Sequence, residues 1–135
     1  MSPDEMKTAF QHYIEEAWNR GNTGILDEMM APNYARYMNG PQPPLDREKQ
    51  KRRIMGFRTA FPDIHFDIVD SVASGDKLVS RMEGHGTHQG EFLDMPPTGK
   101  SIVIYAIDIV RFADGKIVEL WGVMDMLSIL QQIRS

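Results

Sequence analysis

The sequence predicts an α+β fold in which helices pack on one face of an antiparallel sheet. Apolar residues recur at helical spacing over much of residues 1–61, whereas residues from Ile64 onward form strand-like runs separated by short turns. Helices followed by a meander of strands are typical of a sheet that buries one face against helices. A chain of 135 residues is also expected to form one domain, here 1–135.

The first helix is the best marked of the expected elements. Ser2 can cap its N-terminus, Pro3 suits the first turn, and Glu5 occupies the position of a capping box. The run Arg20-Gly21-Asn22 is expected to end it. Its apolar residues form one stripe that needs a partner surface: Met6, Phe10, Tyr13, Ile14, Ala17 and Trp18.

Two further helices are expected before the strands. A short one runs from about Thr23 to Met30, and a longer one runs from the cap residue Asp46 to Phe61. The segment Tyr34–Met38 is expected to be extended, and the Pro- and Gly-rich loop that follows it is a candidate flap. The basic cluster Arg47 to Arg53 in the long helix is interpreted as a solvent-exposed face.

Four strands are expected in the second half, joined by tight turns and by the loop DMPPTG. Their predicted bounds are Ile64–Ala73, Lys77–His88, Lys100–Phe112 and Lys116–Asp125. A short amphipathic helix, Met126–Ile133, is expected to close one end of the sheet.

The composition argues against several classes of protein. A formal charge of -4 and a pI near 5.5 provide no basic surface, so no nucleic-acid partner is expected. Without cysteine the chain forms no disulfide and no cysteine-ligated metal site, which fits a cytoplasmic location. No window approaches the roughly 20 apolar residues of a membrane span, so no membrane partner is expected.

One carboxylate stands inside a strand that otherwise consists of core-type residues. Asp108 lies between Ile107 and Ile109, where apolar neighbours favour its protonated or paired form. One interpretation is that Asp108 lines a pocket and moves a proton as a catalytic acid or base. The other is that Asp108 forms a structural ion pair with Arg81 or Arg111.

A second carboxylate, Asp125, ends the last expected strand. Period-two spacing puts it on the same face as Glu119 and Trp121, and one interpretation is that it lies at the open end of a pocket and is catalytic. The alternative is that Asp125 caps the final helix, which starts at Met126. Trp121 is expected to form a pocket wall.

His88, in the run GTHQG, is the third catalytic candidate. A histidine with a pKa near neutrality can shuttle a proton or stabilise an oxyanion, although the same residue can simply fix the next loop by hydrogen bonds. His85 and His88 lie three residues apart, which on a strand places them on opposite faces. No metal site is therefore expected.

The candidate substrate-binding residues combine aromatic and basic side chains. Arg81 would bind a carboxylate or an enolate if its strand face is concave, and would lie in solvent or at a dimer interface if that face is convex. Tyr34 and Tyr37 precede the candidate flap and either cover a ring-shaped ligand or belong to the core. The full candidate set is Trp18, Tyr34, Tyr37, Arg81, Tyr105 and Trp121.

Three separated motifs resemble the SnoaL-like polyketide cyclase family of the nuclear-transport-factor-2-like superfamily. They read EEAWNRGNTGILDEMM, RMEGHGTHQGEFLDMPPTGK and IDIVRFADGKIVELWGVMD, and the similarity runs from about Phe10 to Ile133. The resemblance implies a cone-shaped, curved antiparallel sheet wrapped around the N-terminal helices, an α+β barrel with an apolar interior. It also implies a homodimer paired sheet to sheet.

The resemblance further implies a polyketide cyclase that acts on a small apolar polycarbonyl substrate by intramolecular aldol-type ring closure. Asp108 would be the base, with Asp125 as the second choice, and His88 or Arg81 would stabilise the enolate. No cofactor is expected. Family members often carry His-Trp-Asp where this chain reads Leu120-Trp121-Gly122. Two alternatives stay open: a non-catalytic protein that binds a small hydrophobic ligand, and an isomerase or hydrolase on the same scaffold.

Overall fold

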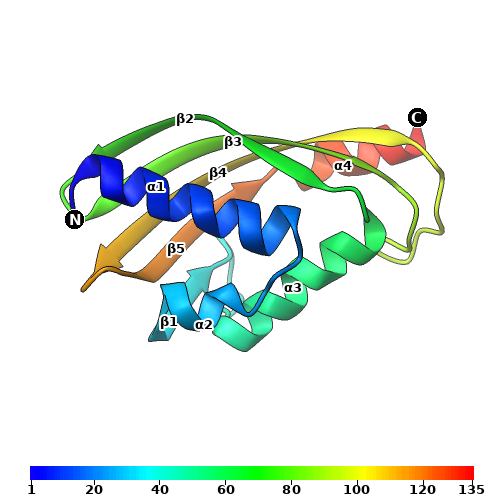
Figure 1. Ribbon diagram of the computed structural model, residues 1–135. Helices are drawn as coiled ribbons and strands as arrows, with labels where there is room; N and C mark the ends of the chain where they lie inside the picture. Colours follow the sequence, from blue (N-terminus) through cyan, green and yellow to red (C-terminus); the bar gives the residue numbers. More distant parts are fainter.

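The computed structural model describes residues 1–135 and shows a curved five-stranded sheet with helices across its concave side (Figure 1). The α+β fold is therefore confirmed. In chain order the elements are α1 (Pro3–Tyr13), η1 (Ile14–Asn19), α2 (Ile25–Met29), β1 (Met30–Tyr37), α3 (Arg47–Ala60), β2 (His65–Ser74), β3 (Lys77–Thr87), β4 (Ser101–Ala113), β5 (Lys116–Met124) and α4 (Met126–Arg134).

The strand order is β1-β5-β4-β3-β2, so β1 and β2 are edge strands and the sheet stays open. Three neighbouring pairs are antiparallel, as expected, but β1 runs parallel to β5. Strand β1 begins at Met30, earlier than expected, and includes Pro32. An edge strand tolerates proline because the missing N–H group need not pair on its free side.

The first helix differs from a regular α-helix in its second half. Ser2 and Glu5 form the expected capping box, but η1 is wound as a π-helix, with the N–H group of Arg20 donating to the Glu15 carbonyl at 3.1 Å. The i→i+5 bonding of a π-helix makes residues five apart neighbours. It thereby brings Trp18 next to Tyr13. In an α-helix, two residues at this spacing would point in different directions.

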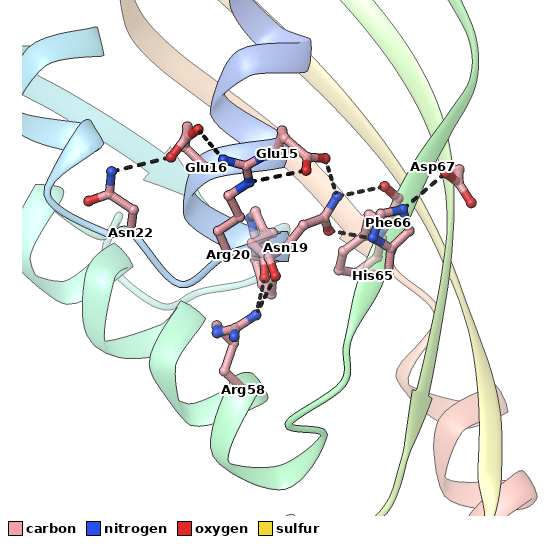
Figure 2. Close-up of polar contacts among 10 residues, drawn as sticks. Glu15, Glu16, Asn19, Arg20, Asn22, Arg58, His65, Phe66 and Asp67 are labelled. Atoms are coloured by element: carbon pink, nitrogen blue, oxygen red, sulfur yellow. Dashed lines mark hydrogen bonds and ion pairs between the residues drawn. The ribbon is translucent and has the colours of Figure 1, made fainter.

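Figure 2 shows how the end of η1 is fastened to β2 and α3. The Phe66 N–H group donates to Asn19 Oδ1 at 2.7 Å, and Asn19 Nδ2 donates back to the Phe66 carbonyl at 3.1 Å. Arg58 donates to the main-chain carbonyls of Trp18 and Asn19 at 2.7 and 3.0 Å. These bonds satisfy backbone groups at a helix end and on an edge strand, and they fix the position of Trp18.

Side chains alternate between the two faces of the sheet. On β4, Ala106 and Val110 are buried against the helices, whereas Tyr105 and Ile107 are about half exposed on the outer face. Asp108 takes the inward position between Ala106 and Val110. No helix has both the length and the apolar composition needed to cross a bilayer.

Candidate functional site

A pocket lies between the concave face of the sheet and the helices. Its inner hollow has a volume of about 20 Å³, which is room for roughly one water molecule. Most of the lining is apolar and includes Trp18. The side chains with polar groups come from α1, β1, α3 and β4: Tyr13, Arg36, Gln50, Arg53 and Asp108.

An outer chamber of about 550 Å³ adjoins the inner hollow, and Arg36 and Arg53 line both. Its rim comes from two loops, with Met38 and Asn39 on one side and Phe92 on the other. This volume falls within the range of roughly 300–1,000 Å³ typical of small-molecule pockets. The outer chamber therefore has room for a ligand, while the inner hollow has room only for the end of one.

Asp108 faces into the inner hollow. Its side chain is 14% exposed, and Oδ1 lies 3.9 Å from an Nη atom of Arg36, which is 4% exposed. Burial raises the pKa of Asp108 above its ordinary value, and the opposing effects of Arg36 and Arg53 are smaller. The interpretation that Asp108 pairs with Arg81 or Arg111 is wrong, because both arginines point to the other face of the sheet.

Arg53 is held in the pocket by aromatic rings. Its guanidinium carbon lies 5.7 Å from the ring centroid of Trp18 and 5.3 Å from that of Phe57, which is cation–π geometry. Burial first, and the nearby charge of Arg36 second, lower the pKa of Arg53 to about 10. Arg53 thus stays positively charged at neutral pH, and the expectation that the whole basic cluster is a solvated face is wrong for this residue.

A hydrogen-bond network connects α1 to α3 at the wall of the hollow. The Tyr13 hydroxyl accepts from Trp18 Nε1 at 3.2 Å and from Gln50 Nε2 at 3.3 Å. Burial, with a smaller effect from Asp108, raises the pKa of Tyr13, so the phenol keeps its proton. Since both lone pairs of the hydroxyl oxygen are occupied, this proton is free to be donated.

His88 lies away from this pocket. It is fully buried, its ring packs 5.7 Å from that of Phe61, and its Nδ1 lies 2.9 Å from Thr98 Oγ1 and accepts the Thr98 N–H at 3.3 Å. These contacts tie together the two ends of the loop between β3 and β4. They agree with the alternative in which His88 fixes this loop by hydrogen bonds. His85 is exposed on the opposite face, as the spacing predicted.

Asp125 caps α4. Its side chain accepts the Ser128 N–H group at 3.0 Å, so the capping alternative describes its position. Asp125 lines neither the inner hollow nor the outer chamber.

Trp121 is not a wall of this pocket, because it points to the outer face. There its ring stacks on that of Tyr37 at 5.4 Å, and the Tyr37 hydroxyl donates to Glu119 at 3.2 Å.

Two other candidates for substrate binding also face outward. Arg81 donates to Asp70 at 3.1 Å on the convex face, and Tyr105 is 49% exposed there. Tyr34 faces inward on β1 and is buried, but it lines neither the inner hollow nor the outer chamber, and its hydroxyl has no hydrogen-bond partner. Of the six candidate binding residues, Trp18 alone lines the inner hollow.

Sequence reasoning missed Arg36, Gln50 and Arg53. Signals for them exist: Arg36 shares its strand face with Tyr34 by period-two spacing, and Arg53 follows Gln50 by three positions and precedes Phe57 by four. These spacings place both arginines on apolar faces. The sequence does not show that the two faces meet at Asp108.

Comparisons with known proteins agree with this architecture. The model of the SnoaL-like polyketide cyclase family matches residues 8–133. A proposed polyketide cyclase from Acidithiobacillus ferrooxidans is 31% identical, with a TM-score of 0.87 and coverage of 99% of this chain and 98% of that chain. AclR, a proposed hydroxylase from Streptomyces galilaeus, is 29% identical with a TM-score of 0.88, and 98% of each chain is covered.

TsrD from Streptomyces laurentii is 26% identical, with a TM-score of 0.85 and coverage of 98% of this chain and 97% of that chain. No curated protein sequence matches the chain. The family match over nearly the whole chain and the agreement of these folds lead to one conclusion: the chain belongs to the SnoaL-like polyketide cyclase family.

Proposed function

We propose that the chain is a cofactor-independent cyclase in which Asp108 removes a proton from the carbon next to a carbonyl group. A ketone-bearing ligand in the outer chamber extends its reactive end into the inner hollow, where Asp108 accepts the proton. The enolate then attacks a second carbonyl of the same molecule in an aldol-type ring closure, and the alkoxide that forms takes up the proton held by Asp108. The observation that carries this proposal is one largely buried carboxylate, the single acidic side chain that lines a mostly apolar hollow.

The neighbours of Asp108 suit the charge that develops in this step. Arg36 stabilises an enolate oxygen electrostatically, and the Tyr13 hydroxyl donates a hydrogen bond to it. His88 and Arg81, the enolate partners expected from the sequence, line neither the inner hollow nor the outer chamber. Desolvation of Asp108 also raises its basicity toward that of an effective general base.

The test measures deuterium uptake from D₂O into 2-tetralone, a ring ketone with exchangeable protons next to its carbonyl group. Asp108→Asn is expected to lower the enzyme-catalysed exchange rate by about 10²-fold or more, since general bases contribute about 10²–10⁴-fold. Asp125→Asn is the matched control: asparagine also caps helices, so this variant should exchange at the wild-type rate. An Asp108→Asn variant that folds and exchanges as fast as the wild type contradicts the proposal.

A second candidate function is non-catalytic binding of a small hydrophobic ligand. It is favoured by Gly122, which stands where family members often carry an acid, and by the absence of His88 from the lining of the pocket. The same exchange experiment separates the two functions. A binder would retain 2-tetralone without accelerating exchange in the wild type.

The outer face of the sheet suits a second copy of the chain. Its exposed apolar side chains form a patch over β3, β4 and β5 that comprises Val79, Tyr105, Ile107, Ile109 and Val123. The Arg81–Asp70 and Arg111–Glu119 ion pairs flank this patch, so both signs of charge are present. A two-fold interface needs such a self-complementary surface, because the same patch meets itself.

A further inference from the structure

The pocket contains more positive than negative charge. Arg36 and Arg53 both line the inner hollow, and Asp108 is the one acidic residue there. The outer chamber adds Glu91, whose side chain is exposed to solvent. With Asp108 ionised, the inner hollow has a net charge of +1, and with Asp108 protonated this charge is +2.

The donors of the two arginines are also unused. Arg36 Nε is buried and has no hydrogen-bond partner, and the closest carboxylate oxygen lies 3.9 Å from its Nη atom. Arg53 is held by the rings of Trp18 and Phe57 rather than by an acceptor. Buried guanidinium groups normally satisfy their N–H groups with carboxylate or phosphate oxygens, often in pairs.

Proton transfer to Asp108 does not remove this excess charge. When a proton moves from the substrate carbon to Asp108, the carboxylate becomes neutral and the enolate takes the negative charge, so the net charge of the filled pocket is unchanged. A neutral substrate therefore leaves one positive charge of the pocket without a counter-charge throughout the reaction. A substrate that is already anionic brings the net charge to zero.

We propose that the ligand of this pocket carries a carboxylate, which Arg36 and Arg53 bind where the inner hollow meets the outer chamber. This inference rests on the proposed function in that the same pocket holds the substrate. Gln50 lines the same hollow, and its Nε2 donates to the Tyr13 hydroxyl, which keeps the proton of that hydroxyl free for the ligand. The apolar lining accommodates the rest of the ligand.

The experiment compares binding of 1-naphthoate with that of 1-naphthamide by isothermal titration calorimetry. The two probes have the same shape but differ in charge. The wild type is expected to bind the acid at least about tenfold more tightly than the amide, as for one charge-assisted hydrogen-bonded pair. Equal affinities, or no measurable binding of the acid, overturn the inference.

Substitutions in α3 test whether Arg53 causes the preference for the acid over the amide. Arg53→Gln should bring the two affinities to within about twofold, whereas Arg53→Lys should keep a weaker preference for the acid, because a lysine retains the charge without the planar fork. Arg52→Gln is the matched control: Arg52 is exposed on the same helix, and its replacement should leave the preference intact. A preference that survives in folded Arg53→Gln contradicts the site.

Asp108→Asn separates this inference from the proposed function. Removal of its negative charge should leave 1-naphthoate binding as tight as in the wild type or tighter. If Asp108→Asn exchanges protons normally but the acid preference depends on Arg53, the carboxylate site stands and the catalytic proposal fails. If Asp108→Asn loses exchange and the wild type shows no acid preference, the catalytic proposal stands and the carboxylate site fails.

Discussion

Asp108 on β4 and Gly122 on β5 are cross-strand partners on the inner face of the sheet. A Cβ atom at position 122 would overlap Asp108 Oδ1 and an Nη atom of Arg36, and would lie 2.8 Å from the other Nη atom. The absent side chain of Gly122 therefore provides the space that the Arg36–Asp108 pair occupies. Where the family pattern often places an acid at position 122, this pocket has its acid on the neighbouring strand.

Gly122→Ala is expected to destabilise the fold by about 1–3 kcal/mol, because the added methyl group overpacks the ion pair and both charged side chains must move. The measurement is the urea midpoint of unfolding. Gly56→Ala is the matched control, since a Cβ atom there meets no atom within 4 Å. In the interior of α3 that change should stabilise by about 0.5–1 kcal/mol. Equal effects of both changes would show that space at position 122 is not limiting.

Asp108→Asn is expected to raise stability at neutral pH. Burial raises the folded-state pKa of Asp108 above its unfolded value, so its protonated form is the one that the fold favours. The stability associated with this proton is fully present below the unfolded pKa and is lost as the pH rises through the folded pKa. The neutral amide avoids that loss.

The gain of Asp108→Asn in urea midpoint over the wild type should therefore be present at pH 7 and disappear near pH 3. Asp67→Asn, a change at an exposed aspartate of β2, controls for the loss of one surface charge. A variant that is less stable than the wild type at pH 7 would mean that the pair with Arg36 outweighs desolvation.

Tyr13→Phe is expected to cost about 1–3 kcal/mol of stability, because it leaves the buried donors Trp18 Nε1 and Gln50 Nε2 without their acceptor. Guanidinium chloride unfolding measures this loss. Tyr105→Phe removes the same hydroxyl from a half-exposed residue of the outer face, and should change stability by less than about 0.5 kcal/mol. Similar losses from both variants would contradict the role of the Tyr13 hydroxyl.

Asn19→Ala is expected to destabilise by about 1–3 kcal/mol, because it removes both hydrogen bonds to the main chain of Phe66 (Figure 2). Amide hydrogen exchange should also accelerate at the N-terminal end of β2. Asn22→Ala is the matched control: Asn22 is exposed and makes one side-chain bond, to Glu16. Unchanged exchange in β2 of the Asn19→Ala variant would argue against this anchor.

Ile107→Lys is expected to convert the proposed homodimer to a monomer, because it buries a charge in the centre of the outer apolar patch. Light scattering after size-exclusion chromatography measures the mass. Met55→Lys changes an exposed apolar residue of α3, away from that patch, and should leave the mass unchanged. A wild type that is monomeric at micromolar concentration refutes the proposed interface.

The sequence by itself determined the fold class and the approximate positions of the helices and of the four long strands. The apolar stripe of the first helix is buried as its spacing predicted, from Met6 to Trp18. The four long strands lie close to their expected bounds, because alternation and turn residues are local signals. The sequence also singled out Asp108, since a carboxylate among isoleucines is visible without coordinates.

Tertiary structure alone decided which side chains meet Asp108. Arg36 and Arg53 come from an edge strand and a helix that touch the hollow only when β1 pairs in parallel with β5 and α3 packs inside the curve of the sheet. Likewise, period-two spacing groups Trp121 with its neighbours but does not say which face of the sheet is concave. The partners of a buried charge depend on long-range packing, and local sequence patterns contain no information about it.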